Sequence, residues 1–239
     1  MKNIVAINVS PRKRGTSVML LEKLKNDLEK LGDHVHRIDL YSHLKEMQVV
    51  FDAVSAADTL VICGPCYVNT YPADTTMLLE ELDARPDVLH RQNLYGIIQG
   101  GMPYAHTHIS GLNMLKVFSN KVGLTYQGGF VMGLGALLNG QPLDKLPNGR
   151  KVDKQLTVFF GNIHNGEKSL DSVYETALVK MPWFMTAVLA AMMNRKIDKI
   201  FAARGMDAHE PSPYLDDFTK DAVWDSHNLR VPLDNSIIS

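Results

Sequence analysis

The sequence predicts an α/β fold, a doubly wound, five-stranded parallel sheet followed by a helical C-terminal extension. Two observations predict this class. Short runs rich in valine and isoleucine, with little polar alternation, are typical of strands buried on both faces of a parallel sheet. Segments with apolar residues at helical spacing separate these runs, so strands and helices alternate and right-handed crossovers are expected.

Each element has its own local signal. The apolar runs predict strands at residues 3–9, 34–40, 59–64, 94–101 and 125–133. The helical spacing predicts helices at residues 17–31, 45–57, 73–84 and 106–122. Gly32 and Gly123 follow the first and last helices, where glycine readily adopts the left-handed conformation that ends a helix. Pro72 precedes the third helix, a position that suits its fixed φ.

The remaining sequence is less regular. It predicts a Gly/Pro/Asn-rich connection at 137–151, a helix at 152–167 and a helical region at 172–204 broken near Pro182. Residues 209–239 are polar and contain proline, and they predict an extended arm or a poorly ordered end. We therefore divide the chain into a domain at 1–135 and an extension at 136–239, packed on that domain or on a partner subunit.

Composition excludes several classes of protein. The chain has 239 residues and a formal net charge of -1, so it lacks the basic field that holds nucleic acid or an anionic membrane. The apolar helical stretch at 181–193 is shorter than the roughly 20 residues that span a bilayer. No secretory signal is evident. The two cysteines, Cys63 and Cys66, do not indicate a disulfide scaffold, so a reducing, cytoplasmic compartment is expected.

The turn after the first strand has the composition of a phosphate site. Hydroxyl groups, cations and one glycine lead into the first predicted helix, whose N-terminus offers unpaired N–H groups and a partial positive charge. The candidate ligands of a phosphate are Ser10, Arg12, Lys13, Arg14, Gly15, Thr16 and Ser17. Neither the dinucleotide fingerprint nor the mononucleotide P-loop spacing occurs. A capped helix with solvated cations stays open as an alternative.

The segment from Ser10 to Ser17 resembles the phosphate loop of the flavodoxin-like NAD(P)H-dependent FMN reductases, which typically reads G-S-P-R-x-x-G-N-T. Val9, Thr16 and Ser17 stand where Gly, Asn and Thr are usual, and the last two keep hydrogen-bonding groups. The resemblance covers roughly residues 1–135. It implies a flavodoxin-like fold with bound FMN and with NADH or NADPH as co-substrate.

Two further loops match the same family. Residues 64–73 look like the loop that lies along the flavin ring; its candidate ligands are Pro65, Cys66, Tyr67, Val68 and Asn69, and Tyr71 is expected to add flat apolar surface. The Gly-rich turn that faces the pyrimidine edge of the flavin corresponds to Gln99, Gly100, Gly101 and Met102. Amides of the two glycines are candidates to stabilise negative charge on the reduced ring. Tyr104 and His106 are possible proton donors to an acceptor.

The resemblance implies a ping-pong oxidoreductase. NAD(P)H would reduce FMN and leave, and a quinone, an azo or nitro compound, a flavin or a similar acceptor would follow on the same face. A homodimer or higher homo-oligomer is expected, with Trp183 and Phe184 near the interface. No metal site is predicted, because the segment between the second and third strands has no cysteine for an iron–sulfur cluster.

Two other functions stay open. A flavodoxin-type electron carrier would bind FMN without a small-molecule substrate, but flavodoxins are usually shorter and more acidic. A phosphate-binding regulatory domain would hold no flavin. The C-x-x-C spacing of Cys63 and Cys66 and the pair His106 and His108 are interpreted as structural or surface features, since neither forms a metal-ligand pattern.

Overall fold

A computed structural model describes residues 1–180 and 182–207 of the chain. Five parallel strands form its single described sheet, in the order β2-β1-β3-β4-β5. The strands are β1 (Asn3–Asn8), β2 (His34–Asp39), β3 (Thr59–Pro65), β4 (Asn93–Gln99) and β5 (Thr125–Met132). This confirms the predicted fold class. Strands β3 and β4 are nearly all buried, as the valine- and isoleucine-rich runs require.

The helices agree with the prediction except at some ends. Along the sheet domain they are α1 (Thr16–Lys30), α2 (Leu40–His43), α3 (Met47–Ser55), α4 (Ala73–Asp83), η1 (Ala105–Thr107) and α5 (Ile109–Val122). After β5 come η2 (Gly135–Leu137), η3 (Leu143–Lys145), α6 (Gly149–Asn165), α7 (Ser172–Glu175) and α8 (Trp183–Ala202). Gly32 and Gly123 have positive φ after α1 and α5, as predicted.

Several predicted boundaries differ from the structure by one to three residues, and two of these differences lie near the candidate site. The fourth strand ends at Gln99, so Gly100 and Gly101 belong to the loop. The helix predicted from His106 begins at Ile109, because residues 105–107 form a tighter 3₁₀ turn in which the His108 amide bonds to the Ala105 carbonyl at 2.8 Å.

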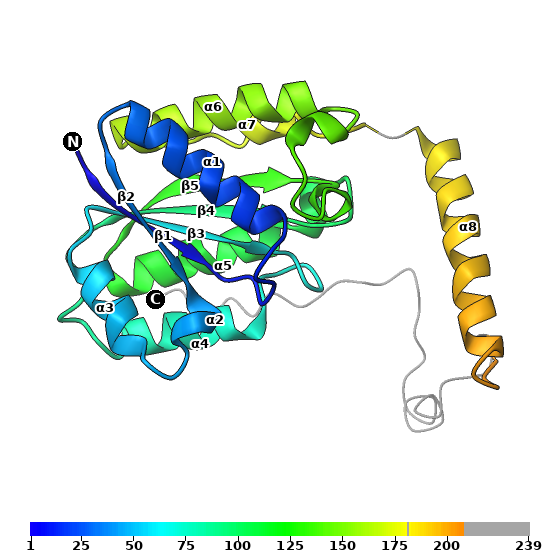
Figure 1. Cartoon of the computed structure of the whole chain (residues 1–239), viewed down its shortest axis with the longest axis horizontal. Helices are drawn as coiled ribbons and strands as arrows, with labels where there is room; N and C mark the ends of the chain where they lie inside the picture. The colour runs from blue at the N-terminus through cyan, green and yellow to red at the C-terminus, as the bar shows by residue number, and fades with distance from the viewer. Residues whose placement is uncertain (181, 208–239) are drawn as a thin grey trace, which may run out of the picture. The chain divides into compact units, whose positions relative to one another are not determined.

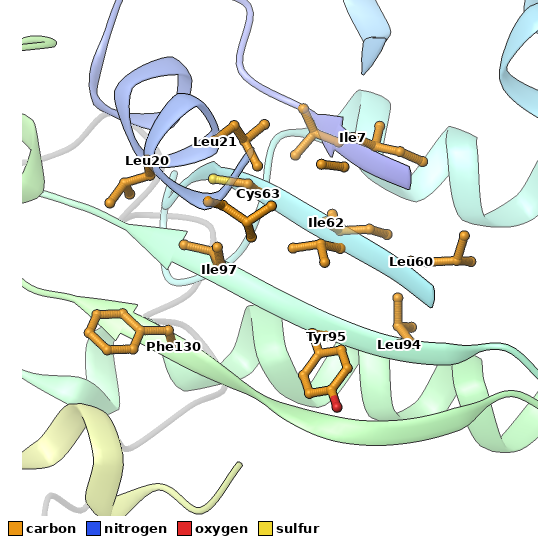
Figure 2. Packing of buried hydrophobic residues seen from close by; sticks show 14 of the residues in the cluster. Ile7, Leu20, Leu21, Leu60, Ile62, Cys63, Leu94, Tyr95, Ile97 and Phe130 are labelled. Atoms are coloured by element: carbon orange, nitrogen blue, oxygen red, sulfur yellow. The ribbon is translucent and has the colours of Figure 1, made fainter. Parts of the chain in front are cut away.

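Helices cover both faces of the sheet (Figure 1). Helices α1, α6 and α7 lie on one face, and α3, α4 and α5 lie on the other. One cluster of buried apolar residues runs through both layers, and Figure 2 shows Leu20 and Leu21 of α1 beside Cys63 and Ile97 of the strands. Alternate residues of β4 therefore face opposite layers, with Gly96 toward α5 and Tyr95 toward α6.

The chain divides into a compact unit that ends at Met181 and a second that begins at Pro182. Residues 136–180 pack with the sheet, which is one of the two arrangements that the sequence left open, and a domain boundary at residue 135 stays a prediction. Helix α8 lies in the second unit. None of the helices in the described part of the chain has the length and apolar character that crossing a bilayer requires. The arm predicted at 209–239 lies outside the described residues.

Candidate functional site

The candidate site lies where the strand order reverses. Strand β1 is flanked by β2 on one side and β3 on the other, so the connections after β1 and β3 leave toward opposite faces and open a crevice between them. A cavity of ≈ 90 Å³ occupies this crevice. Its wall consists of Ser10, Arg12, Gly15, Thr16, Pro65, Cys66, Tyr67, Gln99, Gly100, Gly101, Ala136 and Asn139. The three loops that the sequence singled out thus meet in one place.

The loop after β1 leaves the N-terminus of α1 open. Gly15 precedes the helix, no side chain caps its first turn, and no acidic residue lies there. The first N–H groups of a helix have no intrahelical partner and attract anions. Arg12 adds a cation to the cavity wall, whereas Lys13 and Arg14 are exposed and lie outside it. The geometry fits a phosphate at the helix end.

Not every hydroxyl of this loop is available to a ligand. The Thr16 hydroxyl donates to the Gly135 carbonyl at 2.7 Å and accepts from the Gly140 amide at 3.4 Å, so it ties α1 to the loop after β5. Ser17 is buried behind the wall, where its Oγ accepts from Gln99. Ser10 lines the cavity and accepts from the Arg12 amide at 3.3 Å. Backbone amides and Ser10 are therefore the main candidate ligands.

The loop after β3 forms a tight two-residue hairpin. Tyr67 and Thr70 exchange backbone hydrogen bonds of 2.7 and 3.3 Å, and Val68 and Asn69 between them have φ values of 50° and 70°. Positive φ is costly for a β-branched residue such as Val68, whose side chain is 96% exposed. Val68 and Asn69 lie at the hairpin tip outside the cavity wall, and the exposed Tyr67 ring lies in the wall.

Tyr71 does not offer its ring to a ligand, contrary to the expectation from sequence. Its side chain is buried on the α5 side of the sheet. Three glycines make room for it: a Cβ on Gly64, Gly96 or Gly111 would lie 3.0 to 3.2 Å from an atom of the Tyr71 side chain. The ring is a core element that fixes where the hairpin starts.

The two cysteines lie in different surroundings. Cys63 is fully buried in β3 and Cys66 is half-buried in the cavity wall, with its Sγ 3.2 Å from the Thr107 carbonyl. Burial raises the pKa of both thiols above the ordinary value. Neither is therefore a reactive thiolate near neutral pH.

We expect Cys66 to be alkylated more slowly than a free thiol at pH 7.5. Because its pKa is raised, a smaller fraction is thiolate at that pH, and the rate should keep rising as pH passes the usual thiol range. Iodoacetamide labelling of the native protein, read by mass spectrometry against glutathione, measures this, with Cys63 as the unlabelled internal control. A rate at pH 7.5 equal to that of glutathione would contradict the expectation.

The loop after β4 supplies the third wall. Gly100 and Gly101 line the cavity, and Met102 is exposed outside the wall. A side chain at Gly100 does not fit, since its Cβ would lie 2.5 Å from His108 Nε2 and 3.1 Å from Cys66 Cβ. The sequence named Gly100 for its backbone amide, and it gave no sign that His108 and Cys66 exclude other residues here.

The sequence analysis interpreted His108, together with His106, as a structural or surface residue, and the structure shows that it is structural. It is buried behind Gly100, with Nδ1 2.9 Å from the Tyr104 carbonyl. Burial lowers the pKa of its ring, so the neutral form is favoured. His106, in contrast, is exposed and stacks on Tyr104 with ring centroids 5.4 Å apart. Neither Tyr104 nor His106 is in the cavity wall; both lie on the loop that continues from it.

Ala136 and Asn139 line the cavity from the loop after β5, which the sequence assigned to the extension. Tertiary contacts bring this segment to the site: Gly135 and Gly140 bond to Thr16, and the Ala136 amide donates to the Gly100 carbonyl at 3.2 Å.

A parallel sheet in this strand order, with an uncapped helix at the switch point and two loops beside it, defines the flavodoxin-like fold. A sequence profile of the NADPH-dependent FMN reductase family matches residues 2–134, more than half of the chain. The chain belongs to this family and is an NAD(P)H-dependent FMN oxidoreductase by class. No curated protein matches the sequence.

Solved structures resemble the fold. An NADH:FMN oxidoreductase in its apo form is 19% identical with a TM-score of 0.52, over 73% of this chain and 94% of that one. A short-chain flavodoxin associated with a bacterial microcompartment is 15% identical with a TM-score of 0.52, over 70% and 99%. An NAD(P)H:quinone oxidoreductase from Methanothermobacter marburgensis is 15% identical with a TM-score of 0.51, over 68% and 96%. At these identities the likeness shows the fold.

Proposed function

We propose that the chain transfers a hydride from NAD(P)H through bound FMN to a small-molecule electron acceptor, in a ping-pong cycle. One observation carries the proposal: the loops after β1, β3 and β4 meet in a single cavity at the open end of α1. A quinone, an azo or nitro compound, or a free flavin is the expected class of acceptor. FMN supplies the hydride chemistry when bound, and the protein supplies position and electrostatics.

The residues present suit this cofactor. The α1 amides, Ser10 and Arg12 would hold the phosphate, and Tyr67 and Cys66 would border the ring. The Gly100 and Gly101 backbone approaches the cavity closely because neither has a side chain. Lys13 would add charge from outside the wall, and Ser17, Val68, Asn69 and Met102 would support or flank the ligand. Tyr104 or His106 would donate a proton to the reduced acceptor.

The proposal is tested on the purified protein. We expect a yellow protein, or an apoprotein that takes up added FMN, with absorbance near 450 nm, and bleaching by NADH or NADPH under anaerobic conditions. Steady-state oxidation of the nicotinamide with a quinone then separates this enzyme from a flavodoxin-type carrier, which would show almost none. A protein that refuses FMN would contradict the proposal.

We further propose a homodimer or higher homo-oligomer, in the cytoplasm, with α8 at the interface. The first half of α8 carries no charged residue, and within its own unit large apolar side chains are exposed, namely Phe184, Met185, Val188, Met192 and Met193. A helix that is apolar on all sides must be covered, and a second copy of the chain would cover it. Trp183, the first residue of this helix, and Phe184 would lie near the interface.

Placing charge on α8 should break the assembly. We expect Val188→Lys combined with Met192→Lys to halve the mass measured by size-exclusion chromatography with light scattering, because the two positions share one face of the helix. Leu170→Lys, at an exposed apolar position in the first unit, is the matched control and should leave the mass unchanged. An α8 variant with the mass of the wild-type oligomer would remove this interface.

A further inference from the structure

Gln99 carries an unpaired polar atom in the wall of the cavity. It is the last residue of β4, its side chain faces the α1 layer, and it is only 7% exposed. Its Nε2 lies 3.4 Å from Ser17 Oγ, and its Oε1 has no hydrogen-bond partner among the described residues. Exchanging the two amide atoms would still leave that end of the amide unpaired. Buried polar groups are nearly always paired, so a ligand group is indicated there.

Neighbouring loops limit how far Gln99 can move. The Gln99 carbonyl accepts from the Cys66 amide at 2.6 Å, which joins β4 to the hairpin after β3. Gly135 lies against the side chain: a Cβ there would be 2.7 Å from Gln99 Oε1 and 2.9 Å from Gln99 Cβ. Gly135 is itself fixed by the 2.7 Å bond from Thr16. Contacts from three separate loops therefore hold the backbone of Gln99 and the wall beside its side chain.

The position of Gln99 indicates which part of a ligand it meets. On one side its amide contacts Ser17, beside the helix end that suits a phosphate. On the other side its chain continues into Gly100 and Gly101, the loop assigned to the ring. In FMN the group between phosphate and ring is a polyol chain. A hydroxyl both donates and accepts, so it can pair with whichever amide atom is free.

We propose that the Gln99 side-chain amide hydrogen-bonds a hydroxyl of the ribityl chain and thereby selects a polyol-linked flavin phosphate. The inference rests on the proposed function and deepens it, because it assigns the middle of the ligand to one side chain. Gln99 is a binding residue in this role, and it takes no part in hydride transfer.

The test compares the affinities of wild-type and variant apoprotein for FMN and for its deoxyribityl analogues, measured by quenching of flavin fluorescence. Gln99→Leu shortens the side chain by one bond, keeps a branched end and removes both polar atoms. We expect this variant to bind FMN about tenfold more weakly than the wild type. One of the 2′-, 3′- or 4′-deoxyribityl analogues of FMN should bind wild type and variant equally, because the bond is already missing. The melting temperature of the variant apoprotein should fall only slightly, since the one side-chain bond lost is the 3.4 Å contact between Gln99 Nε2 and Ser17 Oγ.

Three outcomes would overturn the proposal. Equal FMN affinity in wild type and Gln99→Leu would show that the amide makes no bond to the ligand. An equal loss for FMN and all three deoxy analogues would assign Gln99 a structural role only. Wild-type apoprotein that takes up no FMN would overturn this proposal together with the proposed function, whereas the first two outcomes leave that function standing.

Discussion

Replacing Phe159 with alanine is expected to lower the free energy of unfolding by about 3–5 kcal/mol. The Phe159 ring is fully buried in α6, with centroids 5.9 Å from Tyr95, 5.6 Å from Phe130 and 6.1 Å from Phe160. Two of these neighbours come from central and edge strands of the sheet. Truncation therefore opens a cavity between α6 and the sheet that rigid aromatic neighbours cannot fill.

Urea denaturation monitored by circular dichroism measures the loss, and the melting temperature should fall by roughly 10 °C for a unit of this size. The control is Val158→Ala, one residue earlier on the same helix and 44% exposed, which should change stability by less than about 0.5 kcal/mol. Equal stability of the two variants would contradict this expectation, because it would mean that α6 contributes little to the folded core. The expected result makes residues beyond 135 part of the same cooperative core.

The sequence predicted the strands well because a strand that is buried on both faces consists almost entirely of apolar residues. The runs around Ile4–Ile7 and Leu60–Ile62 have no polar face, and only central parallel strands look like this. The parallel direction of the strands then followed from their alternation with helices. Boundaries that depend on particular contacts were harder, and the start of α5 at Ile109 is set by how His108 packs against Tyr104.

The parts of the candidate site that are formed by residues close together in the sequence could be predicted. The phosphate loop could be predicted from its hydroxyl groups, its cations and Gly15, because this loop and the helix N-terminus are neighbours in sequence. Tyr71 was misassigned, since nothing local reveals that glycines from three elements make room for its ring. Ala136 and Asn139 were missed for the same reason: they reach the cavity only through tertiary contacts of their loop.

Gly15→Asp is expected to weaken FMN binding at least a hundredfold relative to Gly15→Asn. Both side chains fit, because Gly15 has an extended backbone and an added Cβ meets no atom closer than 3.8 Å. They differ by one negative charge at the helix end where the phosphate would bind. Two unit charges 5 Å apart interact by about 3 kcal/mol at an effective dielectric of about 20, and a phosphate carries nearly two.

Riboflavin separates charge repulsion from damage to the loop. It lacks the phosphate, so the two variants should bind it equally, and the gap in FMN affinity should shrink as salt screens the repulsion. Asp and Asn both cap helices well, so the two melting temperatures should agree closely. Titration of each apoprotein with FMN and riboflavin by fluorescence quenching gives all four constants. Equal FMN affinities would mean that the phosphate binds elsewhere, and a shared loss of riboflavin binding would mean that the substitution disturbs the loop.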